Sequence, residues 1–179
     1  MNSEQRTGRL EMEMRRVKRL CELNPGLVEV NTDYLSAIRH RGTVHYRFQL
    51  NCESVRLKDT RVVPTQRHEF ELLLGPEYPE RPPLLRWGSP IFHPNILAPN
   101  VCMGLTERWD SNTTIDTVVV WLYDMVRYRL YTLEDSFDPG ATRWAREPVR
   151  QFPLDERTLS LVEPEIQERI VIRMGSERS

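Results

Sequence analysis

Cysteine is scarce in this chain, and the few that occur lie far apart. The three cysteines among 179 residues are Cys21, Cys52 and Cys102. A disulfide framework uses an even number of cysteines, and a zinc cluster needs Cys and His ligands at close spacing, so this pattern argues against both. At least one thiol should therefore be free.

Long apolar runs are missing as well. No stretch approaches the ~20 apolar residues of a membrane-spanning helix, and residues 1–16 lack the apolar region of a signal peptide. The 25 basic and 26 acidic side chains nearly cancel to a formal net charge of -1. This balance calls for neither a nucleic acid nor an anionic membrane as a partner. We expect a cytoplasmic protein.

Residues 3–24 have the pattern of an amphipathic helix. Apolar residues recur at steps of three and four, and the pattern stops at Asn24-Pro25-Gly26. The other face of this helix is basic, with Arg9, Arg15, Arg16, Lys18 and Arg19. By itself, such a face is typical of a solvated helix surface.

Four short segments have the patterns of β-strands, and no helix separates them. Apolar and polar residues alternate over residues 44–50 and 70–74, and further candidates cover residues 27–35 and 84–87. Turns are expected at residues 39–42 and 58–60. Strands that follow one another without helices pair as an antiparallel meander.

Two further helices are predicted after the sheet. Residues 115–128 are apolar around much of the helix circumference, so this helix should cross the sheet as the central core element, with Thr113 and Thr114 as possible N-caps. A short helix is expected within residues 140–150. We assign an α+β fold, with one domain over residues 1–153 and an extension over residues 154–179. The sequence does not decide the structure of that extension, because residues 166–172 fit a helix or a strand.

The stretch over residues 90–109 concentrates local chemistry. It contains the tripeptide His93-Pro94-Asn95, followed by Pro99 and Cys102. The two prolines remove two backbone donors and fix two φ angles, so an ordered, kinked loop is expected here and not a helix or a central strand. Loops of this kind commonly hold functional groups.

Cys102 has two interpretations on its residue type alone. A free cysteine is most often a small buried hydrophobic residue, but Cys102 follows a structured loop, and a thiolate there could attack a carbonyl group. The amide of Asn95 is near enough in sequence to donate to the resulting oxyanion. His93 could act as the base of a Cys/His pair, although its neighbours Phe92 and Pro94 favour a hydrogen bond inside the loop. A metal site would need two further ligands, and no cofactor is expected.

In this order, these residues resemble the ubiquitin-conjugating enzymes over residues 10–153. That family has an amphipathic first helix, a four-stranded meander, a Tyr-Pro-x-x-Pro-Pro turn, a His-Pro-Asn tripeptide, an acceptor cysteine, a tryptophan and a long crossing helix. Here the turn is YPERPP over residues 78–83, the cysteine is Cys102, the tryptophan is Trp109 and the crossing helix is residues 115–128. The resemblance implies the family's α+β fold with a C-terminal helical extension.

By this resemblance, Cys102 would accept the C-terminal glycine of a ubiquitin-like protein from an activating enzyme as a thioester. It would then pass that protein to a lysine amine of a protein substrate. Asn95 would stabilise the oxyanion or order the loop, and His93 would hold the shape of the tripeptide. The family's acidic residue that orients the lysine would be Asp138, if Asp138-Pro139 is aligned with the family's Asp-Pro step. The basic first helix would dock the activating enzyme.

Two loops depart from the family pattern. Glu80 replaces the usual aromatic residue after Tyr-Pro, and residues 110–112 (DSN) follow Trp109 where the family has Ser-Pro-Ala. Both loops normally grip a RING-type ligase, so a conventional RING ligase is a doubtful partner. Cys102 is also one step closer to the tripeptide than usual. Such divergence resembles bacterial relatives encoded beside their own activating enzyme, ubiquitin-like protein and protease, some of them antiviral.

Two other functions compete with an active conjugating enzyme. A non-catalytic module of the same fold, which only binds a ubiquitin-like protein, would need neither Cys102 nor Asn95. A cysteine hydrolase would need a base within hydrogen-bond reach of the thiol. His40, His45 and His68 lie in or beside predicted strands, without such a context. The sequence names neither the ubiquitin-like protein nor the target.

Overall fold

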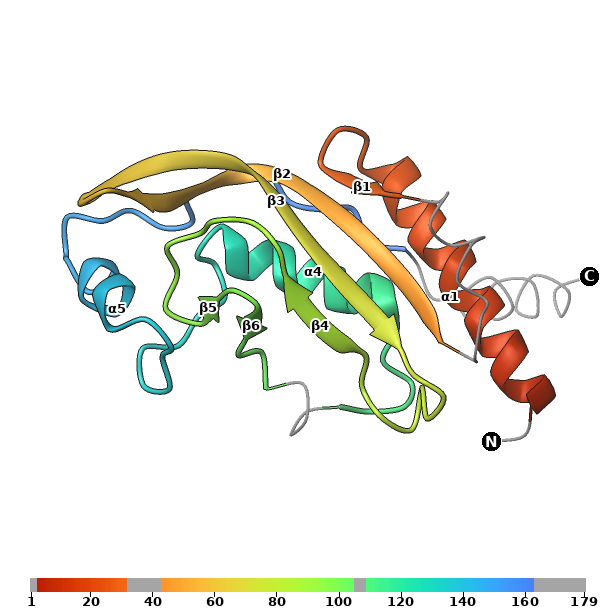
Figure 1. The fold of residues 1–179 in the computed structure, drawn as a ribbon. Helices are drawn as coiled ribbons and strands as arrows, with labels where there is room; N and C mark the ends of the chain where they lie inside the picture. The colour runs from red at the N-terminus through yellow and green to blue at the C-terminus, as the bar shows by residue number, and fades with distance from the viewer. Residues whose placement is uncertain (1–2, 32–42, 105–108, 163–179) are drawn as a thin grey trace, which may run out of the picture.

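A four-stranded antiparallel sheet forms the centre of the molecule, as the strand patterns predict (Figure 1). The computed structural model describes residues 3–31, 43–104 and 109–162. The strands pair in the order β1-β2-β3-β4, which is the expected meander. Their bounds are Val28–Val30 for β1, Val44–Lys58 for β2, Arg61–Leu74 for β3 and Leu84–Trp87 for β4. The turn predicted at residues 39–42 lies outside the described residues.

The hairpin of β2 and β3 extends well beyond the alternating segments of the sequence. Its register shifts between Asn51 and Ser54, as at a β-bulge. Beyond this point the polar Ser54 is buried, and its hydroxyl group donates to the Val126 carbonyl oxygen (2.6 Å), while Leu57 is exposed. In this outer half a polar side chain points inward and an apolar one outward. The alternation that predicted a strand over residues 44–50 therefore did not extend to it.

Two helices pack against the sheet. α4 (Ile115–Val126) lies behind the sheet in Figure 1 and is buried on most of its sides, as its apolar circumference predicts. α1 (Ser3–Leu23) packs against β1 and α4 and buries Val17 and Leu20, so its amphipathic pattern is confirmed. Within the described ranges, we find no helix with the length and hydropathy that a membrane crossing requires.

A buried glutamate on α1 fixes the start of α4. Glu13 is fully buried, and its Oε2 atom accepts a hydrogen bond from the backbone N–H of Ile115 (2.8 Å). Its Oε1 atom accepts from Arg9 Nε (2.7 Å) and from the Tyr78 hydroxyl group. Thr114 occupies the N-cap position, as predicted, but its side chain makes no capping hydrogen bond. A side chain from α1 therefore satisfies one of the N–H groups that have no partner within α4.

Some basic side chains of α1 make hydrogen bonds to other parts of the protein, and others are exposed to solvent. Arg9 also donates to the Thr113 carbonyl oxygen (2.6 Å), and Arg16 makes two hydrogen bonds to the Asp116 carboxylate (2.8 and 3.0 Å). These two guanidinium groups hold α1 against α4 and the chain before it. The exposed basic residues of the same face are Arg15, Lys18 and Arg19.

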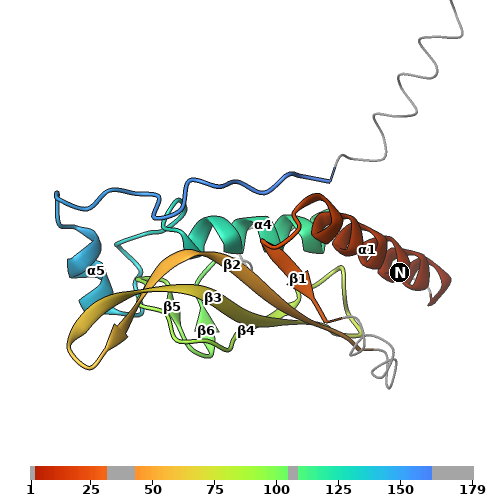
Figure 2. The same ribbon diagram turned by 90° about the horizontal axis from the view of Figure 1, so that it is seen from above.

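The chain ends, in the part that the structure describes, with a short helix and an extended segment. α5 spans Pro139–Ala145. Residues 146–162, here called the C-terminal strap, run without helix or strand along α4 to α1 (Figure 2). Asn24, just after α1, exchanges two hydrogen bonds with the backbone of Ser160 (2.9 and 2.6 Å). α5 is the short helix expected within residues 140–150. The described part of the extension, residues 154–162, contains no helix, and residues 166–172 lie outside the described residues.

Candidate active site

The His-Pro-Asn tripeptide is a buried turn that leads into β5 (Ile96–Leu97). His93 is fully buried, and its Nδ1 atom accepts a hydrogen bond from the backbone N–H of Asn95 (3.0 Å). Burial lowers the pKa of His93 to about 3, against a smaller opposing effect of the Met125 carbonyl group. The imidazole is therefore neutral near pH 7 and holds the turn together.

Cys102 follows a small hairpin that returns the chain to the tripeptide. β5 pairs with β6 (Asn100–Val101), with Ile96 opposite Val101. The backbone N–H of Cys102 donates to the carbonyl oxygen of Asn95 (2.8 Å). The kinked loop predicted from the prolines thus contains two very short strands, and they place the thiol beside the tripeptide.

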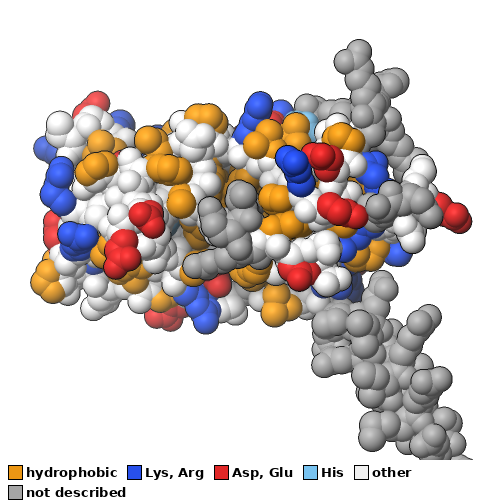
Figure 3. Space-filling model, turned by 90° about the horizontal axis from the view of Figure 1, so that it is seen from below, with side chains coloured by type: hydrophobic (Ala, Val, Ile, Leu, Met, Phe, Trp, Pro, Cys, Tyr) orange, Lys and Arg blue, Asp and Glu red, His pale blue; other side chains and the backbone are white. Residues whose placement is uncertain are grey.

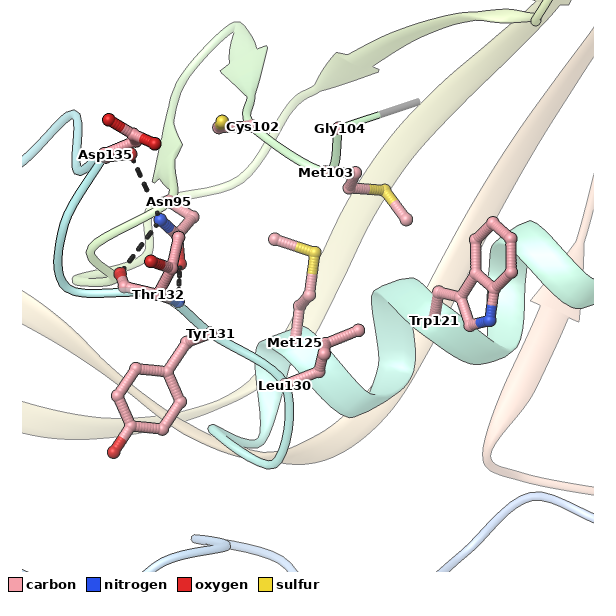
Figure 4. Close-up of a pocket in the computed structure, with 10 residues that line it drawn as sticks. All are labelled: Asn95, Cys102, Met103, Gly104, Trp121, Met125, Leu130, Tyr131, Thr132 and Asp135. Atoms are coloured by element: carbon pink, nitrogen blue, oxygen red, sulfur yellow. Dashed lines mark hydrogen bonds between the residues drawn. The ribbon is translucent and has the colours of Figure 1, made fainter. Parts of the chain in front are cut away.

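The Cys102 side chain is half-buried and lines a groove of about 650 Å³. The side chains around this groove divide into a polar and an apolar group. They are Asn95, Thr132 and Asp135 at one end, and Met103, Trp121, Met125 and Leu130 towards the other (Figure 4). The thiol therefore faces space in which another molecule fits, with polar groups on one side and apolar groups on the other.

The sequence predicted only part of this groove. Trp121 and Met125 belong to the apolar pattern of α4, and nothing in that pattern separates a groove residue from a core residue. Leu130 and Thr132 come from the connection after α4, which has no motif. The face of the molecule that bears β5 and β6 also exposes many apolar side chains, with charged groups spread among them (Figure 3).

The side-chain amide of Asn95 is used by the chain that follows α4. Its Oδ1 atom accepts from the backbone N–H of Thr132 (2.8 Å), and its Nδ2 atom donates to the Thr132 carbonyl oxygen (3.1 Å). Nδ2 also makes a longer hydrogen bond to the Asp135 carbonyl oxygen (3.4 Å). Asn95 thus orders the loop over residues 132–135 against the tripeptide, and both of its N–H groups have acceptors.

Two aspartates lie near the tripeptide, in different environments. Asp138 is the N-cap of α5: one of its carboxylate oxygens, Oδ1, accepts from the backbone N–H groups of Gly140 (2.8 Å) and Ala141 (3.0 Å). Asp135 is exposed and lines the groove beside Cys102. Sequence reasoning named Asp138 and missed Asp135, because both are acidic residues of one loop and only the cap geometry separates them.

The proline-rich turn over residues 78–83 and Trp109 contact each other. The indole N–H of Trp109 donates to the Pro79 carbonyl oxygen (2.7 Å), and the Trp109 ring lies 5.9 Å from the Tyr78 ring. Tyr78 in turn contacts Glu13 of α1. Two motifs that are separate in the sequence therefore brace one another.

In the part of the chain that the structure describes, the other thiols and histidines do not form a second site with Cys102. Burial raises the pKa of Cys21 to about 11 and that of Cys52 to about 12, so neither forms a thiolate near pH 7. His68 Nε2 lies 3.0 Å from the carbonyl oxygen of Cys52, not from its thiol. No histidine is among the described side chains that line the groove, and the described residues contain no cluster suited to a metal ion.

Comparisons with known proteins agree with this geometry. The family model of the ubiquitin-conjugating enzymes matches residues 54–152, more than half of the chain. Among solved structures, S. cerevisiae Ubc12 matches with a TM-score of 0.55 and 21% identity, over 73% of this chain and 69% of that chain. A Plasmodium yoelii protein assigned to the ubiquitin-conjugating enzymes matches with a TM-score of 0.56 and 15% identity, over 78% and 84% of the two chains. A search of curated sequences finds no match. At these identities the solved structures support the fold alone.

Proposed function

Since the chain belongs to the ubiquitin-conjugating enzyme family, we propose that Cys102 receives a ubiquitin-like protein from an activating enzyme and transfers it to an amine of a target protein. The observation that supports this most directly is the half-buried side chain of Cys102 at the wall of an open groove. The backbone of the same residue is hydrogen-bonded to the tripeptide. A module that only binds has no need of a thiol in that position.

The reaction consists of two acyl transfers at one sulfur atom. The Cys102 thiolate attacks the carbonyl carbon of the thioester on the activating enzyme, and the C–S bond to that enzyme breaks as its cysteine leaves as a thiolate. A target amine then attacks the new thioester, loses a proton and forms an amide, and Cys102 leaves with its bonding electron pair. Each transfer passes through a tetrahedral oxyanion.

Asn95 is the proposed donor to that oxyanion. Its amide is held by two hydrogen bonds to the backbone of Thr132, while the bond to the Asp135 carbonyl oxygen is long, at 3.4 Å. The longer bond is the one that Asn95 gives up when a stronger, charged acceptor forms beside Cys102. Asn95 thereby both orders the loop and supplies a donor.

The carboxylate that receives the incoming ammonium group is a choice between Asp138 and Asp135. Asp138, the residue that the family alignment predicts, has an oxygen engaged by two N–H groups of α5. Asp135 lines the groove and is exposed. These contacts favour Asp135, because an exposed carboxylate beside the thiol attracts an ammonium group to the point of attack.

The partners follow from the same proposal. Arg15, Lys18 and Arg19 are the outward basic groups of α1, and they form the proposed contact with the activating enzyme. Glu80 is exposed in the proline turn, so that turn presents a charge where a RING ligase usually finds an aromatic ring. A cytoplasmic conjugation system of the bacterial type, with its own activating enzyme and ubiquitin-like protein and a role in antiviral defence, fits this divergence.

A charging reaction with replaced cysteines tests the proposal. With the activating enzyme, the ubiquitin-like protein and ATP, the wild type should form an adduct that reducing agent removes. Cys102→Ser should form an ester that resists reducing agent, and Cys102→Ala should form no adduct. Cys21→Ser and Cys52→Ser are matched controls that should charge like the wild type. Charging of Cys102→Ala would refute the assignment of Cys102, whereas a wild type that binds the ubiquitin-like protein and forms no adduct would favour the non-catalytic binding module.

A further inference from the structure

A cluster of aromatic rings packs against the tripeptide. It consists of Phe92, Tyr128, Tyr131, Trp144 and Phe152, here called the aromatic cluster. The ring of Tyr128 is its centre. That ring lies 4.6 Å from His93 and stacks on Phe152 at 4.9 Å, with an angle of 9° between the two planes. One ring therefore contacts both the tripeptide and the C-terminal strap.

Tyr128 is held in an unusual backbone conformation. Its φ angle is +64°, in the left-handed region that a residue with a bulky side chain rarely adopts. The side chain is almost fully buried, and its hydroxyl group donates to the Phe92 carbonyl oxygen. Such a conformation persists only where surrounding contacts impose it. The contacts that the structure provides are Phe92, His93 and the strap residue Phe152.

The strap is fixed to α4 by a buried arginine. Arg127 is among the largest fully buried side chains, and its Nη1 atom donates to the carbonyl oxygens of Asp155 (2.8 Å) and Arg157 (2.9 Å). The Leu154 N–H donates to the Arg127 carbonyl oxygen (2.8 Å), and the Asp155 carboxylate accepts from the Glu53 N–H (2.8 Å). Figure 2 shows the strap running along α4 from α5 to α1. Phe152 is therefore presented by an anchored segment.

Phe152 also reaches Asn95 by a second route. It contacts Tyr131, with ring centres 5.6 Å apart. Thr132, which follows Tyr131 in the chain, makes the two shorter hydrogen bonds to the Asn95 amide (2.8 and 3.1 Å). The single side chain of Phe152 thus supports the tripeptide through Tyr128 and the residue that holds the Asn95 amide through Tyr131.

We propose that the C-terminal strap, through Phe152, is a positioning element that aims the Asn95 amide for transfer from Cys102 to an amine. This inference rests on the proposed function of Cys102. Thioester exchange is the easier of the two transfers, because a thiolate is a better nucleophile near pH 7 than an amine, which is mostly protonated there. Loss of Phe152 should therefore leave acylation of Cys102 intact and slow the transfer to an amine.

The test uses the full chain and a chemical acyl donor. A short peptide α-thioester that ends in Gly-Gly acylates the protein, the excess is removed, and the acyl-enzyme is mixed with free lysine at increasing concentrations. Mass spectrometry follows both steps. Phe152→Ala should acylate at the wild-type rate and transfer on the order of tenfold more slowly at saturating lysine, since small errors of position are costly in catalysis. Its KM for lysine should be unchanged.

Three further variants separate positioning from stability. Phe152→Tyr keeps the stacked ring and should restore transfer. Leu159→Ala shortens a strap residue that packs on the core outside the aromatic cluster, and should transfer like the wild type. Phe152→Leu keeps an apolar side chain and loses the stacked ring. It should be slow in transfer alone, which covers the case in which Phe152→Ala fails to fold.

The outcomes distinguish the two proposals. A wild type that is not acylated at Cys102 refutes the proposed function. If the wild type is acylated and Phe152→Ala or, where that variant does not fold, Phe152→Leu transfers at the wild-type rate, the strap has no positioning role and the proposed function stands. A parallel loss of acylation and transfer in Phe152→Ala and Leu159→Ala would also overturn the positioning role, because it would report lost stability.

Discussion

Replacing Asn95 by alanine separates the two roles that this side chain can have. The structure gives its amide three hydrogen bonds, two to Thr132 and one to the Asp135 carbonyl oxygen. A hydrogen bond in a protein contributes about 0.5–1.5 kcal/mol net, and the Thr132 groups regain water because this residue is exposed. The three bonds together contribute about 1.5–4.5 kcal/mol, and water recovers part of this, so Asn95→Ala should lower the free energy of unfolding by about 1–3 kcal/mol.

The effect on transfer should be larger than this loss of order. Removing one donor from an oxyanion site slows a reaction by about 10²–10³-fold, or roughly 3–4 kcal/mol. The assay is single-turnover transfer from acylated Cys102 to lysine, measured beside a thermal melt. Asn95→Asp is the comparison variant: it keeps the acceptor for the Thr132 N–H and loses the donor. Its second carboxylate oxygen faces the carbonyl oxygens of Thr132 and Asp135 in a buried site, so it should melt no higher than Asn95→Ala and transfer as slowly.

One result would refute this reasoning. If both variants transfer within about threefold of the wild type, a difference near 0.6 kcal/mol, while Asn95→Ala melts lower, then Asn95 only orders the loop over residues 132–135. The oxyanion would then be stabilised by another donor, and the long bond to the Asp135 carbonyl oxygen would have no part in the reaction.

Two further predictions concern charge. Asp135→Asn should raise the KM for lysine and slow the transfer to lysine. Asp138→Asn should mainly lower the melting temperature, because asparagine is the weaker N-cap here. The reverse pattern would show that Asp138 is the carboxylate that receives the ammonium group. Burial lowers the pKa of His68 to about 4 and that of His93 to about 3, both below the unfolded value, so the unfolded state takes up the proton first as the pH falls. Each buried histidine should therefore cost about 1.4 kcal/mol of stability per pH unit between pH 6 and pH 4. The free energy of unfolding of His68→Gln, measured with denaturant, should fall less steeply with falling pH than that of the wild type. Equal slopes would contradict the burial argument.

Much of the fold could be predicted from local patterns, because its strands and helices bury regular faces. The alternation around Phe48 and Phe70 and the apolar circumference of α4 both correspond to elements of the structure. The outer half of β2 could not be predicted, since Ser54 faces inward there through a hydrogen bond to Val126. Glu13 was hidden for a similar reason, because a charged side chain inside an apolar stripe gives no sign that it caps another helix.

The residues of the candidate site could also be predicted only in part. Cys102, Asn95 and His93 follow from a short run of sequence whose prolines enforce a loop. The partners of Asn95 could not be predicted, because Thr132 and Asp135 approach it only when α4 has crossed the sheet. The support from Phe152 depends on the path of the strap, which is set by Arg127 and not by any local pattern.

The most direct test of the central claim is to find the modified residue in the charged protein. The three cysteines fall in three different tryptic peptides, residues 20–39 for Cys21, 48–56 for Cys52 and 87–108 for Cys102. After charging with activating enzyme, ubiquitin-like protein and ATP, the protein is unfolded in denaturant without reducing agent. A thiol-blocking reagent should then label the first two peptides and leave the third unlabelled until reducing agent releases the adduct. A Cys102 peptide that is labelled in full while the protein carries its adduct would contradict the account.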